Sequence, residues 1–136
     1  MNILLCDGNQ AVKLIDLGIS KCLKGTIATS AAQQCTPRYI SPEQLKGYLS
    51  IKNDIWAFGG ILLQFATGVL IYDDIRSENQ LYFKILLGET PLEYMMKFYE
   101  DKCKVIRQNK DFSTLLEACF NRDHQARPSA AQILKF

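Results

Sequence analysis

The sequence predicts a mainly α fold, α+β overall, in which a short β-hairpin precedes a helical bundle built around one buried apolar helix. Two short apolar runs flank a turn sequence near the N-terminus. Residues Ile55–Tyr72 carry no charge, and apolar residues recur at helical spacing in the rest of the chain. With 136 residues, the chain has the length of one domain.

The hairpin is predicted from two strand-like runs, Ile3–Cys6 and Ala11–Ile15, because the residues between them, Asp7–Gln10, form a turn sequence. The segment that follows, Ser20–Gln34, is rich in Ser, Thr, Ala and Gly and shows no strong period. It predicts a long loop, which in a compact domain is typical of a functional or disordered segment.

Folding this hairpin about Asn9 places Asn2 opposite Asp16. Amide and carboxylate oxygens at one end of a hairpin suit Mg²⁺, a hard cation that takes oxygen ligands. Gly18 would let the chain turn sharply behind the carboxylate. Taken alone, these residues favour a simpler alternative, a surface hairpin that an Asn and an Asp merely cap.

The first helix is predicted to begin at Pro42, with Ser41 and Gln44 as its capping box, and to end at Gly47. Asp54 is predicted to cap the long apolar helix. Four further helices are predicted from capping residues and apolar spacing: one that begins at Ser77–Gln80, with Leu81, Ile85 and Leu86 inward and Gly88 as its stop; one over Pro91–Tyr99; one marked by Phe112, Leu115, Leu116, Cys119 and Phe120; and one that begins at Pro128, with Ser129 and Gln132 as its capping box.

Composition excludes several classes of function. The net charge of +2 is nearly balanced and the charges are scattered, so we expect no nucleic-acid partner. The five cysteines are odd in number and include no Cys-x-x-Cys, which indicates reduced thiols in a cytoplasmic protein. No secretory signal is visible at the N-terminus.

The uncharged stretch Ile55–Tyr72 has about the length that spans a bilayer. Its interior contains Gly59, Gly60 and Gln64, and an acidic residue, Asp54, adjoins it where a membrane helix prefers Lys or Arg. A helix that is apolar on all sides also suits the centre of a globular domain. We therefore predict a buried helix and no membrane partner, and keep a single-pass membrane protein as an alternative.

Two motifs in order give the chain a family resemblance. The segment Lys13–Gly18 reads KLIDLG, and Thr36–Glu43 reads TPRYISPE. Together they resemble the metal-binding and substrate-binding segments of a eukaryotic protein kinase of the serine/threonine type. The resemblance implies that residues 1–136 are a partial protein kinase domain, namely its C-terminal lobe from the end of the catalytic loop onward.

The resemblance implies a role for each matching residue. Asn2 and Asp16 would bind Mg²⁺, and Gly18 would complete the segment that faces ATP. Thr36 would position the substrate. Residues 19–35 would form the activation loop, with three candidate phosphorylation sites: Thr26, Thr29 and Ser30.

Structural roles follow from the same resemblance. Glu43 would form a partly buried, two-pronged ion pair with Arg127. Asp54 would brace the catalytic loop through its backbone N–H groups, and Trp56 would anchor the central helix in the core. Gln64 stands where some members have an acidic residue, so we expect no strong preference for basic substrates.

The resemblance also implies what the chain lacks. The catalytic base and the ATP-binding lobe would lie upstream of Met1, so we expect this chain alone to be inactive and marginally stable. The whole protein would transfer the γ-phosphoryl group of ATP to Ser or Thr of a protein substrate, and its N-terminal lobe would pack on this lobe. The alternative is a non-catalytic, kinase-like protein-interaction module.

Overall fold

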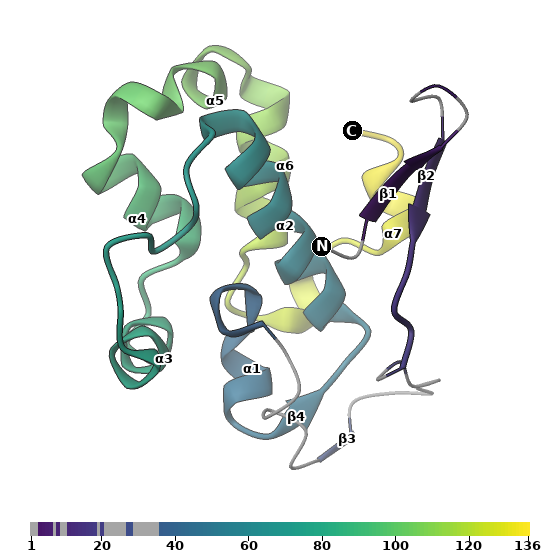
Figure 1. Cartoon of the computed structure of the whole chain (residues 1–136), viewed down its shortest axis with the longest axis vertical. Coiled ribbons are helices and arrows are strands. Elements are labelled where there is room, and N and C mark those ends of the chain that lie inside the picture. The colour runs from purple at the N-terminus through teal and green to yellow at the C-terminus, as the bar shows by residue number, and fades with distance from the viewer. Residues whose placement is uncertain (1–2, 7, 9–10, 19, 21–26, 29–35) are drawn as a thin grey trace.

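The computed structural model describes residues 3–6, 8, 11–18, 20, 27–28 and 36–136. Figure 1 shows a helical body with a β-hairpin at one side. The strands are β1 (Ile3–Cys6), β2 (Ala11–Leu14), β3 (Ile27–Ala28) and β4 (Tyr48–Leu49). The α-helices are α1 (Pro42–Leu45), α2 (Lys52–Thr67), α3 (Glu78–Leu87), α4 (Pro91–Phe98), α5 (Lys104–Gln108), α6 (Lys110–Cys119) and α7 (Ala130–Ile133), and short 3-10 helices lie at η3 (Pro37–Tyr39), η4 (Glu100–Cys103) and η5 (His124–Ala126).

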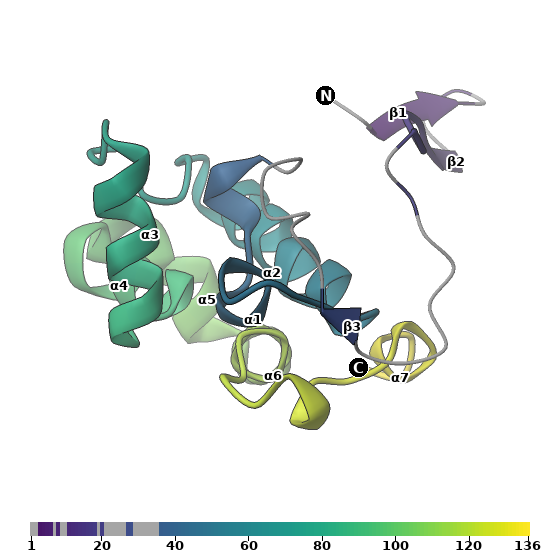
Figure 2. The same cartoon turned by 90° about the horizontal axis from the view of Figure 1, so that it is seen from below.

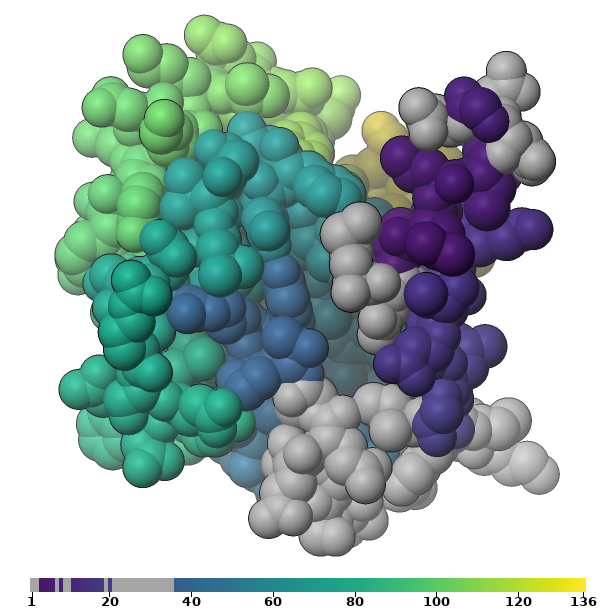
Figure 3. All heavy atoms as spheres, in the orientation of Figure 1, coloured from purple at the N-terminus to yellow at the C-terminus, as the bar shows by residue number. Residues whose placement is uncertain are grey.

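The predicted hairpin is confirmed. Strands β1 and β2 are antiparallel, and the ladder runs from the pair Ile3–Leu14 to the pair Cys6–Ala11. This register is offset by one residue from the one in which Asn2 would face Asp16. The hairpin stands apart from the helices in Figure 2 and forms a separate ridge in Figure 3. Its apolar side chains are consequently exposed, among them Leu4, Leu5, Val12 and Leu14.

A second, smaller sheet was not predicted. Strand β3 pairs antiparallel with β4, and Ile27 lies opposite Leu49. This pairing attaches the described part of the predicted long loop to the chain that follows α1. Two-residue strands carry too little period-2 pattern to be recognised in a sequence.

Helix α2 runs through the middle of the helical body, with α6 beside it (Figure 1). It begins earlier than predicted, at Lys52, so Asp54 lies within its first turn and the prediction that Asp54 caps the helix is wrong. The turn before the helix is organised by other side chains: Ser50 Oγ accepts from the Lys52 N–H, and Asn53 Oδ1 accepts from the Ser50 N–H. Gly68, at φ 68°, ends the helix.

Helix α2 is buried on one side and open on the other. Ile55, Trp56 and Leu63 face the core, whereas Phe58 is 37% exposed and Phe65 is 73% exposed. In the described part of the chain, no helix combines the length and the hydrophobicity that crossing a bilayer requires.

Among the other helices, α5 was not predicted, and α7 begins at Ala130 and not at Pro128. At α1, the structure forms one bond of the predicted capping box, from the Gln44 N–H to Ser41 Oγ at 3.4 Å. Helix α3 buries Leu81 and Ile85 and ends before Gly88, at φ 114°, but Leu86 is 42% exposed, so its predicted inward position is wrong. Leu86 follows Ile85 directly, and this step of about 100° around the helix turns it away from the core. Ser129 and Gln132 form the predicted capping box of α7.

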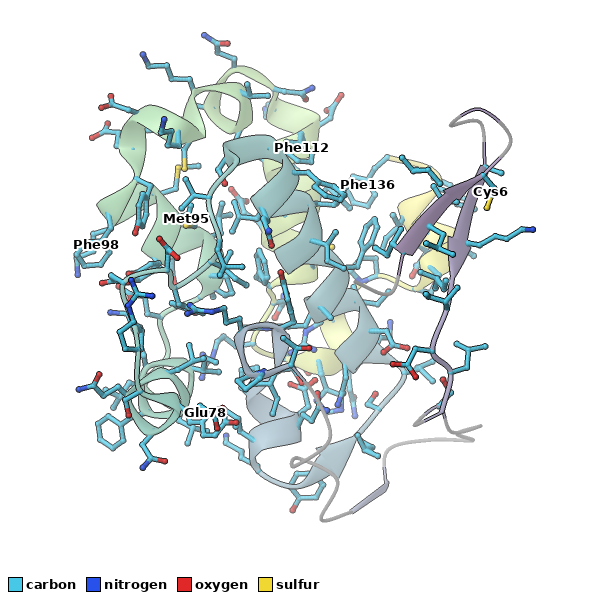
Figure 4. The ribbon with its side chains drawn as sticks, viewed as in Figure 1. Cys6, Glu78, Met95, Phe98, Phe112 and Phe136 are labelled. Atoms are coloured by element: carbon cyan, nitrogen blue, oxygen red, sulfur yellow. The ribbon has the colours of Figure 1, made fainter. Side chains whose placement is uncertain are left out.

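The core gathers side chains from the helices around α2. Its buried members come mainly from α2, α3, α4 and α6, together with the segments between them: Ile40, Trp56, Leu63, Ile71, Tyr72, Leu81, Ile85, Leu92, Tyr94, Met95, Cys103, Ile106, Leu116 and Phe120. Figure 4 shows the resulting division on α4, where Met95 lies within the helical body and Phe98 lies at its outer edge.

Candidate active site

The predicted metal ligand Asp16 lies just beyond the end of β2, with its carboxylate exposed to solvent. Its backbone is left-handed, at φ 63°, a conformation that Asp adopts more readily than most residues. No described residue donates a hydrogen bond to this carboxylate. The side chain is therefore available to a ligand from outside the described residues.

The predicted turn at Gly18 is present, since the Ser20 N–H donates to the Leu17 carbonyl at 2.9 Å across it. The left-handed residue is Asp16, and Gly18 is not among the residues of positive φ. A Cβ atom at Gly18 would meet Asp16 Oδ1 at 3.6 Å, an ordinary van der Waals distance. The turn at Gly18 therefore leaves space for a side chain, and the residue in the left-handed region is Asp16 itself.

Several predicted site residues lie outside the described residues. They are the second metal ligand and the candidate phosphorylation sites: Asn2, Thr26, Thr29 and Ser30. The shared metal site of Asn2 and Asp16 and the phosphorylation of the loop stay predictions.

The predicted substrate-positioning residue, Thr36, is exposed and precedes η3. The Tyr39 N–H donates to the Thr36 carbonyl at 3.1 Å, which closes the 3-10 turn. The Tyr39 hydroxyl donates to Gln64 Oε1 on α2. Burial raises the pKa of this hydroxyl, an effect that the nearby Arg38 charge opposes. Tyr39 thus attaches the segment that contains Thr36 to the central helix.

Arg38 is a site residue that the sequence did not single out. Its Nη1 donates to the carbonyls of Ile71, at 3.0 Å, and Tyr72, and its Nη2 donates to the carbonyl of Ile75 at 3.2 Å. All three acceptors belong to the loop between α2 and α3. Backbone carbonyls have no residue signature, so the sequence offered no signal for these contacts beyond the presence of an arginine.

The predicted pairing of Glu43 with Arg127 is present. Arg127 Nη1 donates to Glu43 Oε1 at 2.7 Å, and Nη2 donates to Oε2 at 2.8 Å. Burial alone would raise the pKa of the Glu43 carboxyl, but the hydrogen bonds and charge of Arg127 outweigh it and hold that pKa below its ordinary value. The pair fixes the end of the predicted substrate segment to the C-terminal part of the chain.

Trp56 lies in the core, as predicted. Its ring meets that of Phe120 edge-to-face, with the centroids 5.2 Å apart. The Arg127 guanidinium lies 4.8 Å from the centroid of the Trp56 ring, within the range of a cation–π contact. Trp56 therefore joins α2, α6 and the buried ion pair in one packed unit.

Asp54 makes none of the contacts given for this unit. Its residue is exposed, and no described residue donates a hydrogen bond to its carboxylate. Partial desolvation raises its pKa, with no opposing cation. The structure thus brings Glu43, Trp56 and Arg127 together, and it leaves the carboxylates of Asp16 and Asp54 without internal partners among the described residues.

Comparison with known proteins gives one consistent result. The family described as protein kinase domain matches residues 1–136. The chain is 34% identical to the dual specificity mitogen-activated protein kinase kinase mek-1 of Caenorhabditis elegans, over 98% of this chain and 36% of that protein. It is 30% identical to dual specificity mitogen-activated protein kinase kinase 7 of Homo sapiens, over 98% of this chain and 31% of that protein.

A third relative is named as a serine/threonine-protein kinase and not as a dual specificity kinase. The chain is 31% identical to the serine/threonine-protein kinase Nek11 of Macaca fascicularis, over 93% of this chain and 18% of that protein. The chain therefore spans about a third or less of the length of these relatives.

Proposed function

The chain belongs to the protein kinase family, and from this premise we propose that it is the substrate-binding lobe of a cytoplasmic serine/threonine kinase. In the whole protein, the γ-phosphoryl group of ATP passes to a Ser or Thr hydroxyl of a protein substrate. Thr36 positions that substrate, and Asp16 with Asn2 serves the metal and the nucleotide.

One observation carries the proposal. The buried pair of Glu43 and Arg127 fixes the segment that begins at Thr36, while the hairpin leaves Asp16 exposed. Phosphoryl transfer depends on positioning and on electrostatic stabilisation more than on covalent chemistry by the protein. A rigidly held substrate segment with an available carboxylate supports this kind of reaction.

The described residues fit the expected cofactor in part. Asp16 offers an exposed carboxylate without an internal hydrogen bond, which is the oxygen donor that Mg²⁺ prefers. Asn2 would supply a second oxygen. When bound, Mg²⁺ neutralises charge on the ATP phosphates. Gly18, two residues after Asp16, would leave the backbone accessible beside the nucleotide.

Exposed apolar surface supports a second part of the proposal, that the N-terminal lobe and the catalytic loop pack on this chain. Phe58 and Phe65 form an open face of α2, and Leu5 and Val12 are exposed on the hairpin. Asp54, on the same helix, lacks a described partner and would accept hydrogen bonds from the catalytic loop. We infer that the chain alone transfers no phosphate, because the catalytic base and the ATP lysine would lie outside its 136 residues.

The same exposed apolar surface favours a second candidate function, a non-catalytic interaction module. A partner protein could cover α2 and the hairpin instead of a kinase N-terminal lobe. The two candidates differ in one respect that can be measured, namely phosphoryl transfer by the protein that the complete gene encodes.

The test is a phosphotransfer assay with Mg²⁺ and ATP on the complete gene product. We expect Ser/Thr phosphorylation of a protein substrate, and we expect Asp16→Asn to lower the rate by about 100-fold or more, as for loss of one preorganised electrostatic group. Asp101→Asn, which removes an exposed carboxylate of η4, should keep the wild-type rate. A folded but inactive wild-type protein would favour the interaction module.

A further inference from the structure

Arg38 connects the segment that contains Thr36 to the loop between α2 and α3. Its guanidinium donates to three backbone carbonyls within five residues of chain, those of Ile71, Tyr72 and Ile75. A guanidinium has five N–H donors in a planar fork, so one side chain can satisfy several carbonyls of a turn at once. This use of an arginine is structural, because both Nη atoms donate to backbone carbonyls of the protein.

The loop that Arg38 holds has an unfavourable backbone. Tyr72 lies at φ 56°, in the left-handed region, which is a genuine outlier for a bulky side chain. The ring of Tyr72 is buried and lies 4.8 Å from the ring of Tyr94, centroid to centroid. Strained conformations of this kind persist only where the surroundings impose them. The Arg38 hydrogen bonds and the packing of Tyr72 supply that constraint.

The next residue along η3 provides a second attachment. The Tyr39 hydroxyl donates to Gln64 Oε1, and its ring lies so close to α2 that a Cβ atom at Gly60 would be 2.9 Å from Tyr39 Cδ1. Consecutive residues of η3 are therefore fixed to α2 and to the loop that follows it. Since the Tyr39 N–H also holds the Thr36 carbonyl, these two attachments determine where Thr36 lies.

We propose that Arg38 is a positioning residue for the protein substrate, which acts by holding the loop Ile71–Ile75 and the Thr36 segment in one fixed relation. The inference rests on the proposed kinase function. Its part in this role is to hold the backbone, because both of its Nη atoms donate to carbonyls of the loop.

The first experiment examines the loop by amide hydrogen exchange of this chain. Arg38→Gln should increase exchange in peptides that cover residues 69–78 by about tenfold, as expected when hydrogen bonds to a charged donor are lost. Arg76→Gln is the matched control, since Arg76 is an exposed arginine just after the loop. Arg38→Lys keeps a hydrogen-bond donor, so its exchange should lie between that of the wild type and that of Arg38→Gln. Equal exchange in Arg38→Gln and Arg76→Gln would overturn the role of Arg38 in the loop.

The second experiment measures kinetics with the complete gene product. Arg38→Gln should raise the KM for the protein substrate by about tenfold, a loss on the scale of the hydrogen bonds removed, and leave the KM for ATP unchanged. Arg38→Lys should have a KM for the protein substrate between those of the wild type and Arg38→Gln. An unchanged substrate KM, or equal increases of both KM values, would overturn the positioning role.

Failure of the proposed function and failure of the role given to Arg38 can be distinguished. A wild-type protein without phosphotransfer would overturn the proposed function and with it the substrate role of Arg38, whereas hydrogen exchange would still decide whether Arg38 holds the loop. An active wild-type protein with an unaffected Arg38→Gln variant would overturn only this inference.

Discussion

Glu43 and Arg127 are 84 positions apart in the sequence and form a two-pronged ion pair within the core. The Arg127 side chain is also bonded through Nε to the Asn121 carbonyl, at 2.8 Å, and through Nη1 to the Lys52 carbonyl, at 3.0 Å. Its charge and donors are thus satisfied at 1% exposure, while Glu43 is 8% exposed. One side chain joins α1, the start of α2 and the segment after α6.

Removal of this arginine should destabilise the fold strongly. Arg127→Met keeps much of the volume but leaves the Glu43 charge buried without a partner, so we expect the free energy of unfolding to fall by about 3–5 kcal/mol. Urea denaturation followed by circular dichroism measures this. Arg107→Gln is the control: it breaks the exposed pair with Glu100 and should cost less than about 1 kcal/mol. Similar losses in both variants would contradict the structural role given to Arg127.

The pH dependence of stability should follow from the same pair. A carboxyl whose pKa is lower in the folded than in the unfolded chain adds stability that is complete above the unfolded value and is lost as the pH falls through the folded value. The Glu43 pKa is lowered in this way. We expect the free energy of unfolding to decrease as the pH falls from about 5 through the acidic range. Glu43→Gln should show a shallower decrease, and identical slopes would contradict the argument.

Asp54 should affect the pH dependence of the free energy of unfolding in the opposite sense. Desolvation raises its pKa, so its charged form costs stability near neutral pH, and this cost disappears as the pH falls through the folded and then the unfolded value. In this chain, Asp54→Asn should therefore leave the stability near pH 7 unchanged or raise it, because only the small favourable interaction with the helix N-terminus is lost. In the complete gene product it should lower the melting temperature, because hydrogen bonds with the catalytic loop would be lost. Equal effects in both proteins would argue against that brace.

Local signals in the sequence predicted most of the helices. Ser129 and Gln132 form the predicted capping box because the pattern, and the bonds that it encodes, lie within four residues. The same signature occurs at Thr90 and Glu93, where the structure forms both bonds of a capping box, and it would have fixed the start of α4. The prediction that Leu86 faces inward was wrong because the spacing of apolar residues predicts which face of a helix is apolar, not how much of that face its neighbours cover.

Contacts between distant segments were predicted only where the family resemblance supplied them. The pairing of Glu43 with Arg127 came from matching motifs, and no local pattern of the chain encodes it. The bonds from Arg38 and the pairing of β3 with β4 were missed, because both join backbone groups that any residue carries. The left-handed backbone at Asp16 was not predicted, since glycine is the usual residue of positive φ.

The packing of α2 against α6 should tolerate no side chain at Gly59. A Cβ atom there would lie 2.8 Å from Cys119 Cβ, closer than packed atoms approach, and 3.1 Å from Phe120 Cζ, a tight contact. Alanine favours a helix over glycine by about 1 kcal/mol, but overpacking of this kind costs about 1–3 kcal/mol. Because the obstruction at Cys119 is a Cβ atom, which no rotamer change can move, the steric cost should prevail and Gly59→Ala should lower the free energy of unfolding in urea. Gly18→Ala, where the new Cβ would have only an ordinary contact, should change it little, and a Gly59→Ala variant more stable than wild type would show that α2 and α6 lie further apart than described.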